Sequence, residues 1–191
     1  MTRTPQGELF LLDSPLTGEV RGERSLMAFP FFALSKNAWM KSLAYSTPSV
    51  SIEVRPSTKG VATIYDKEIV LYIASLMASK MEDGEDVSQD FVFTAHDLFS
   101  VTGSNHSSRS YERLADALER LQGTQIATNI ITGGRETFDL FSLIDRARIV
   151  RETSEGRMQE VEIVLSDWIF QAVEAQEVLT LDRRYFQLAK P

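Results

Sequence analysis

The sequence has 191 residues, a formal net charge of −7, 43% apolar residues and no cysteine. This length and composition allow a sizeable buried core and argue against wholesale disorder. The lack of cysteine excludes disulfides, thiol catalysis and thiolate metal sites, and the acidic balance argues against a general nucleic-acid binder. No apolar stretch approaches the length of a membrane span or a secretory signal, so we expect a soluble, cytoplasmic protein without membrane contact.

The N-terminal third of the chain predicts an arm, a strand and a helix. Residues 1–28 are rich in glycine, proline, threonine and charge, which is typical of a flexible arm. Residues 29–34 are rich in aromatic side chains and are expected to pack on a core. Alternation over 50–54 predicts a half-buried strand, and the spacing of apolar residues predicts a helix over 67–81 with Asp66 as its N-cap.

The middle of the chain predicts two helices separated by a polar turn. A short strand is expected at 91–93, and Thr94 is expected to cap a helix that stops at Gly103. A longer helix is predicted over about 109–122, with Gly123 as its C′ residue. Its apolar stripe consists of Tyr111, Leu114, Ala115, Leu118 and Leu121.

Two hairpins are expected after these helices. Alternation predicts strands at 125–131 and 136–144, joined by a turn that contains two glycines. A second hairpin is predicted from 146–151 and 158–165, where arginines of the first strand can pair with glutamates of the second. The order helix, turn, longer helix, strand, turn, strand indicates an α+β fold, a winged helix-turn-helix with an extended β-hairpin and additional helices, over 29–181.

The turn and the start of the longer helix carry residue types suited to DNA. Residues 103–157 contain eight basic and eight acidic side chains, and every basic one is arginine, which favours bidentate contacts to phosphate and guanine. The helix is expected to present its N-terminal residues to base edges or phosphates, and the two-glycine hairpin is expected to act as a wing. The candidate DNA-binding residues are Asn105, His106, Ser107, Ser108, Arg109, Arg113, Gly133, Gly134 and Arg135.

A structural reading of the same residues remains open. The helix could be a core helix whose outer face carries three arginines, the third being Arg120, balanced by Glu112, Asp116 and Glu119. The two-glycine turn could belong to any hairpin. A protein-interaction module is a further alternative, with dimerisation by isologous pairing of exposed strands at 125–131 or 158–165. The candidate dimerisation residues are Ile126, Thr128, Ile130, Val161 and Ile163.

Catalytic and metal sites find no support in the sequence. His96 and His106 with Asp97 lack a third strong ligand and a known metal-site spacing. No nucleophile triad, phosphate loop or carboxylate pair stands out. We therefore expect no enzyme activity, no metal and no cofactor.

Several segments resemble plasmid replication initiators of the RepA (replication initiator protein A) family. The resemblance covers most of residues 29–190, and the block PSTKGVATIYDKEI within it is quite specific. The matching segments are FPFFALSK at 29–36, IEVRPSTKGVATIYDKEIVLYIASLM at 52–77, SYERLADALERLQGTQIATNI at 110–130, VEIVLSDWIFQAV at 161–173 and LTLDRRYFQL at 179–188.

This resemblance implies a bacterial plasmid protein that binds repeated sites in a replication origin and helps to open it. Family members carry two tandem winged helices, so residues 182–191 are expected to start a linker toward a second one that is missing here. The first domain is then expected to support homodimerisation and auxiliary contacts to double-stranded origin DNA, with host replication proteins as further partners. One departure concerns Ser107 and Ser108, where family members often have two glycines. A stand-alone winged-helix transcription regulator is the remaining alternative.

Overall fold

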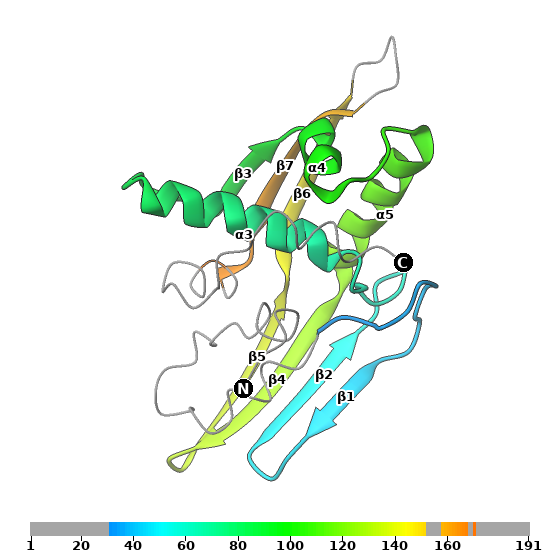
Figure 1. The fold of residues 1–191 in the computed structure, drawn as a ribbon. Helices are drawn as coiled ribbons and strands as arrows, with labels where there is room; N and C mark the ends of the chain where they lie inside the picture. Colours follow the sequence, from blue (N-terminus) through cyan, green and yellow to red (C-terminus); the bar gives the residue numbers. More distant parts are fainter. Residues whose placement is uncertain (1–30, 152–157, 168–169, 171–191) are drawn as a thin grey trace, which may run out of the picture.

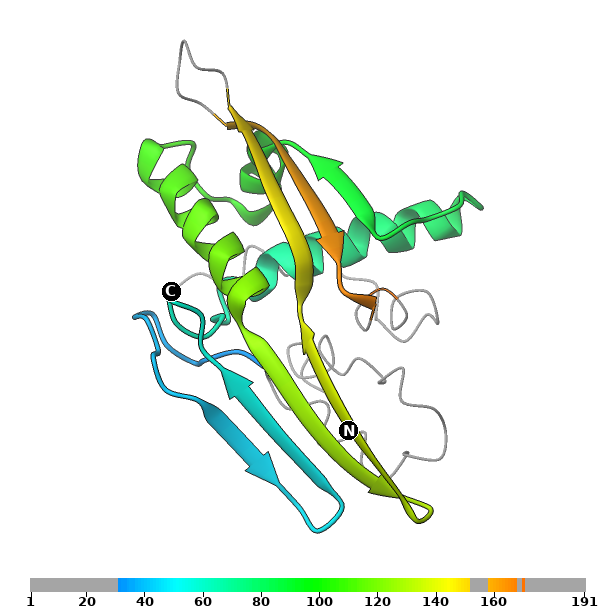
Figure 2. The same cartoon turned by 180° about the vertical axis from the view of Figure 1, so that it is seen from behind.

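The computed structural model describes residues 31–151, 158–167 and 170. This part of the chain combines helices with two antiparallel sheets, as Figures 1 and 2 show from opposite sides. The helices are α3 (Lys67–Glu82), α4 (Ala95–Thr102) and α5 (Ser108–Gly123). The strands are β1 (Leu43–Ser46), β2 (Val50–Arg55), β3 (Asp90–Phe93), β4 (Gln125–Thr132), β5 (Arg135–Ser142), β6 (Ile144–Arg151) and β7 (Met158–Leu165).

The larger sheet has the strand order β1-β2-β4-β5, with every neighbouring pair antiparallel. One face of it is buried, because Ile52 of β2 lies opposite Thr128 of β4, and both are only 2% exposed. The strand expected at 50–54 is confirmed as β2, with its alternating burial. Strand β1 was not predicted, because LAYS is too short for alternation to stand out.

The smaller sheet has the order β3-β7-β6, so the strand before α4 pairs with the last strand described. Its pairing is irregular between Ile144 and Arg146, and again between Val150 and Arg151. The second predicted hairpin is thereby confirmed. In Figure 2 the helices lie behind these three strands, so they cover one face of the sheet.

Local capping explains where α4 begins and ends. The hydroxyl of Thr94 accepts a hydrogen bond from the backbone N–H of Asp97 at 3.0 Å, as the sequence predicts. Gly103 ends the helix with φ of 69°, a left-handed conformation that glycine adopts without a steric penalty.

The other two capping predictions fare differently. Asp66 occupies the N-cap position of α3, as predicted, but its side chain makes no capping hydrogen bond. The prediction for Gly123 is wrong. Gly123 is a helical residue rather than the left-handed C′, and the extended Thr124 caps α5. Glycine is needed at 123 because a Cβ there would lie 2.7 Å from the Cβ of Ser57.

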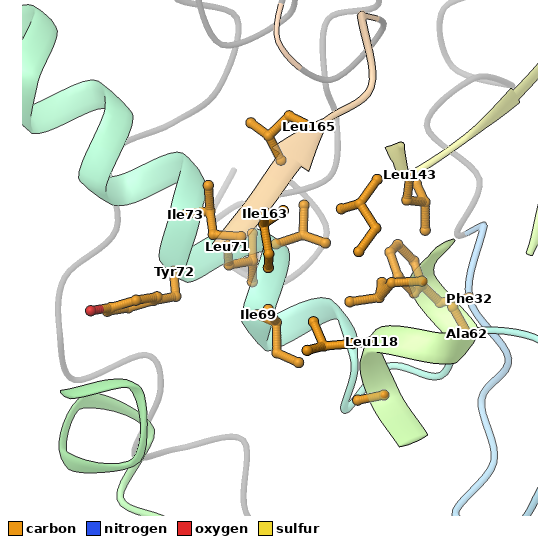
Figure 3. Close-up of a cluster of buried hydrophobic side chains, with 14 of the residues drawn as sticks. Phe32, Ala62, Ile69, Leu71, Tyr72, Ile73, Leu118, Leu143, Ile163 and Leu165 are labelled. Carbon is orange, nitrogen blue, oxygen red and sulfur yellow. The ribbon is translucent and has the colours of Figure 1, made fainter. Parts of the chain in front are cut away.

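The core joins all three helices to both sheets. Figure 3 shows Ile69 and Ile73 of α3 near Ile163 of β7, with Leu118 of α5 close by. Ile73 has no exposed area and Ile163 is 1% exposed. Burying one such side chain is worth about 1.5–3 kcal/mol, so this cluster fixes the position of α5 against the smaller sheet.

The predicted mixture of helices and antiparallel strands is confirmed. The arm at 1–28 and the linker at 182–191 lie outside the described residues, so their predictions are untested. Among the described residues, no helix is long and apolar enough to cross a membrane.

Candidate nucleic-acid interface

The turn between α4 and α5 is organised by a small network of polar side chains. Ser107 is the N-cap of α5, and its hydroxyl accepts a hydrogen bond from the N–H of Ser110 at 3.3 Å. The hydroxyls of Ser107 and Ser110 both donate to Oδ1 of Asn105 at 2.7 Å. Ser107 has φ of −83°, so glycine is not required there, and the serine pair is compatible with the turn.

An aromatic stack fixes His106 beside this turn. Its ring lies on the ring of His96, with centroids 4.3 Å apart and an interplanar angle of 23°. Phe99 contacts His106 at 5.8 Å and Tyr111 at 5.1 Å. These contacts connect the turn to both α4 and α5. Among the described residues, no group of three or more His, Cys, Asp or Glu side chains is placed to hold a metal ion.

The first turns of α5 present cations to solvent. Arg109 and Arg113 are both exposed and lie four residues apart, hence on one face of the helix. The salt bridges between described residues do not include either of them. All six candidates from Asn105 to Arg113 are therefore together at the exposed start of α5.

Arg120 does not lie on the outer face as the sequence suggested. Its guanidinium donates to both carboxylate oxygens of Asp66, at 2.7 and 2.8 Å, and the side chain of Asp66 is 2% exposed. This hydrogen bonding raises the pKa of Arg120 and keeps it charged. Asp66 also accepts from the N–H of Thr63 at 2.8 Å. Tertiary contacts therefore use this arginine, which helical periodicity cannot reveal.

The start of α5 is more positive than the helix as a whole, because two of its three acidic residues lie after Arg113. Arg120 is neutralised by Asp66, and Asp116 pairs with Lys59 at 3.3 Å. The segment from Ser108 to Arg113 retains two arginines and one glutamate. Its local charge is favourable for phosphate even though the whole chain is acidic.

The two-glycine hairpin is formed but does not join this cluster. Gly133 and Gly134 have φ values of 57° and 76°, as a tight hairpin turn requires, and Arg135 is exposed. In both Figure 1 and Figure 2 this tip points away from the start of α5, at the opposite end of the molecule. The hairpin that was expected to act as a wing therefore does not lie beside the start of α5.

The premise behind the candidate dimerisation residues is also wrong. Strands β4 and β7 are central in their sheets, so neither offers a free edge. The five candidate side chains fill the protein's own core. The prediction failed because alternation identifies a buried face of a strand but not what covers that face. The exposed fractions are 0% for Ile126, 2% for Thr128, 5% for Ile130, 0% for Val161 and 1% for Ile163.

The structure adds three arginines that the candidate DNA set omitted. Arg146, Arg148 and Arg151 are exposed on β6, the outer strand of the smaller sheet. Of the expected pairs with glutamates, only Arg148 to Glu162 is found among the described residues, at 3.6 Å. The C-terminal end of β6 lies at the same end of the molecule as the start of α5 (Figures 1 and 2), and Arg151 is the last residue of that strand. The alternate spacing of Arg146 and Arg148 in one predicted strand was the sequence signal that could have identified these arginines.

Comparison with known proteins identifies the family. The family model described as replication initiator protein A matches residues 21–191. The chain belongs to this family. It is also 34% identical over 187 residues to a protein named "Putative replication protein" from Wigglesworthia glossinidia brevipalpis, covering 96% of this chain and 67% of that protein. A role in replication initiation follows from this membership.

Two crystal structures of domains 2 and 3 of the protein RctB share the fold. The first has a TM-score of 0.63 at 16% identity, and the second has a TM-score of 0.57 at 15% identity. The matches cover 81% and 82% of this chain but only 61% and 64% of the RctB chains. This chain therefore resembles the RctB domains in fold over less than two thirds of their length.

Proposed function

We propose that this chain is the N-terminal domain of a plasmid replication initiator, which binds double-stranded origin DNA as an auxiliary contact and forms a homodimer. The proposal describes a binding role without catalysis. The observation that carries it is the cluster of exposed polar and cationic side chains at the start of α5, held by the Asn105 network and the His96–His106 stack.

The element order supports a winged helix, although not with the hairpin first expected. In the proposed assignment α3, β3, α4 and α5 precede the wing hairpin β6–β7, and the three strands form one sheet in the order β3-β7-β6. The β4–β5 hairpin is then an insertion that extends a separate sheet with β1 and β2. A recognition helix and a wing at the same end of the molecule are what a winged helix needs to bridge a groove and the adjacent backbone.

The proposed DNA contacts follow from this assignment. Arg109 and Arg113 would contact phosphates or guanine edges from α5, and Arg151 would contact the backbone from the wing. Asn105, Ser107 and Ser108 would position the helix start, where backbone N–H groups and the helix dipole favour phosphate. Arg135 remains a separate proposed contact because it lies at the other end of the molecule.

Binding to a duplex that carries origin repeats tests the proposal. Arg109→Ala and Arg113→Ala should each weaken binding and reduce the salt slope by about one unit. Arg55→Ala is the matched control, since Arg55 is bound to Glu53 and Gln125 in the larger sheet. An unchanged slope in both α5 variants would remove this helix from the interface. A chain extended past Pro191 should bind more tightly if this domain is auxiliary.

Dimerisation is proposed through the edge of the larger sheet rather than through the buried residues. Strand β5 is an outer strand, and Phe138 and Leu140 on it are 61% and 50% exposed. They share a face with Ile131, which is 48% exposed. On that face Oδ1 of Asn129 is buried without a hydrogen-bond partner in the described structure. A long apolar edge strand is a ready template for pairing with another copy.

The exposed β5 edge also supports the alternative of a pure dimerisation module. In that case the chain would sediment as a dimer and show no affinity for duplex DNA even at low salt. The stand-alone transcription regulator would instead bind an operator tightly without a second domain. Sedimentation and binding by the same preparation separate these outcomes, and host replication proteins remain further proposed partners.

A further inference from the structure

A second exposed apolar surface is formed by the segment that precedes β1 and by Ile64. Residues 36–42 are all exposed, and they include Trp39 at 41% and Met40 at 55%. Leu34 is 79% exposed and Ile64 is 36% exposed. We refer to these four residues with Lys36 and Lys41 as the Trp39 patch. Neighbouring exposed apolar residues mark an interaction site more often than scattered ones do.

Backbone hydrogen bonds bring the two segments of the patch together. The N–H of Ala33 donates to the carbonyl of Ala62 at 2.8 Å, and the N–H of Ile64 donates to the carbonyl of Ala33 at 3.2 Å. These bonds place Leu34 beside Ile64. The N–H of Val61 donates to the carbonyl of Trp39 at 2.8 Å, which fixes the tryptophan's backbone against the same segment.

Gly60 permits this close approach. Its φ is 102°, and a Cβ at this position would lie 3.0 Å from the carbonyl oxygen of Trp39 and 3.1 Å from its nitrogen. The Sδ atom of Met40 would be at 3.5 Å. The exposed side chains are therefore presented by a fixed backbone, which lowers the ordering cost of binding a ligand.

The charge around the patch is positive in an acidic protein. Residues 31–52 contain Lys36 and Lys41 and no acidic residue, and residues 56–65 contain Lys59 and no acidic residue. Lys59 is bound to Asp116, while Lys36 and Lys41 are exposed and absent from the salt bridges between described residues. A ligand that matches both the exposed apolar side chains and the two exposed lysines combines a negatively charged backbone with flat apolar groups.

We propose that the Trp39 patch binds single-stranded nucleic acid, with a base stacked on the indole and phosphates near Lys36 and Lys41. Aromatic platforms flanked by cations bind unpaired bases with little sequence preference. In duplex DNA the base faces are stacked on one another, so the exposed indole has no base face to stack on. The inference rests on the proposed function, because opening an origin exposes single strands beside the bound initiator.

Anisotropy of a labelled oligothymidylate of about 15 nucleotides tests the proposal, since single-strand binding modules contact roughly 4–16 nucleotides. Trp39→Ala should weaken binding about fivefold or more, while Trp39→Phe should retain most of it. The double variant Lys36→Gln/Lys41→Gln keeps the indole and should lower the salt slope by about 1.4 units, at roughly 0.7 per phosphate contact on a single strand. Lys80→Gln, a lysine at the end of α3, is the matched control.

Tryptophan fluorescence gives a second readout in a Trp168→Phe background, where Trp39 is the remaining tryptophan of the two in the chain. Oligothymidylate should quench it. Absence of quenching, or quenching by vesicles of anionic phospholipid and not by the oligonucleotide, would overturn the proposal.

Duplex binding separates this inference from the proposed function. Arg109→Ala should lose affinity for the origin duplex and keep affinity for oligothymidylate, and Trp39→Ala should show the reverse pattern. If only the first result is obtained, the single-strand site is wrong and the proposed function stands. If Arg109→Ala leaves duplex binding intact and Trp39→Ala loses single-strand binding, the single-strand site stands and the proposed duplex contact of α5 is wrong.

Discussion

At the scale of single residues, the ion pair between Asp66 and Arg120 links the start of α3 to α5. Because Asp66 is 2% exposed, removing its partner leaves a carboxylate buried with little compensation. We expect Arg120→Ala to lower the free energy of unfolding by about 3 kcal/mol in urea titrations. The same variant should also lower duplex affinity, since α5 loses a fixed contact.

The exposed pair between Lys59 and Asp116 is the matched control on the same helix. Its removal by Lys59→Ala should cost less than about 1 kcal/mol, because solvent screens exposed charges. Equal losses for the two variants would contradict a special role for the buried pair.

Lys67 provides a prediction about pH. Burial lowers its pKa from 10.5 to about 8 in the folded protein. Between pH 8 and 10.5 the unfolded chain therefore holds more proton than the folded one, so stability should rise with pH across this window. Lys67→Met should remove that rise in urea midpoints measured from pH 7 to 10. The exposed Lys41, changed to Met, should leave it unchanged.

At the scale of elements, the helices of the candidate interface owe their boundaries to local sequence. We expect Thr94→Ala to cost about 1 kcal/mol of stability, since the N–H of Asp97 loses its acceptor. Ser100→Ala is the matched control within α4, because the hydroxyl of Ser100 donates to the carbonyl of His96 in its own helix and alanine favours helix. A similar loss for Ser100→Ala in thermal unfolding would rule out the cap as the cause.

Sequence patterns over a few residues correctly predicted the helix cap at Thr94, the helix end at Gly103 and the hairpin turn. Thr94, Gly103 and the glycine turn at 133–134 were all predictable, because caps and tight turns depend on residues a few positions apart. The inward turn of Arg120 was not, since its partner Asp66 is 54 positions away. Helical periodicity places an arginine on a polar face, but it cannot reveal a distant carboxylate.

Strand pairing shows the same limit. Alternation in 125–131 correctly indicated a buried face, yet it could not show that β4 pairs on both sides. The two-glycine hairpin follows α5 directly in sequence and was therefore predicted as the wing. In the structure β3 pairs with β7 instead, and the paired residues Phe93 and Val161 are 68 positions apart.

 The four residue pairs between β3 and β7 are 68 to 74 positions apart in the sequence. Contacts over such separations depend on the whole fold rather than on local pattern.

At the scale of the whole molecule, the proposed DNA contacts and the proposed dimer interface lie on different parts of the fold. The DNA candidates gather where α5 begins, and the apolar edge strand β5 belongs to the other sheet. Figures 1 and 2 show the β4–β5 tip at the opposite end of the molecule from the start of α5. A dimer formed through β5 would therefore leave the start of α5 in each copy accessible to DNA.

The β5 edge gives the last prediction. If copies pair through this strand, Phe138→Lys should shift the protein from dimer to monomer in sedimentation experiments, because the lysine would bury a charge or repel its symmetry mate. Val92→Lys is the matched control, since Val92 is 62% exposed on the smaller sheet and Phe138 is 61% exposed. A persistent dimer in Phe138→Lys, or equal dissociation in both variants, would contradict pairing through β5. Duplex affinity of the Phe138→Lys monomer would then report how far DNA binding depends on the dimer, because α5 itself is unchanged.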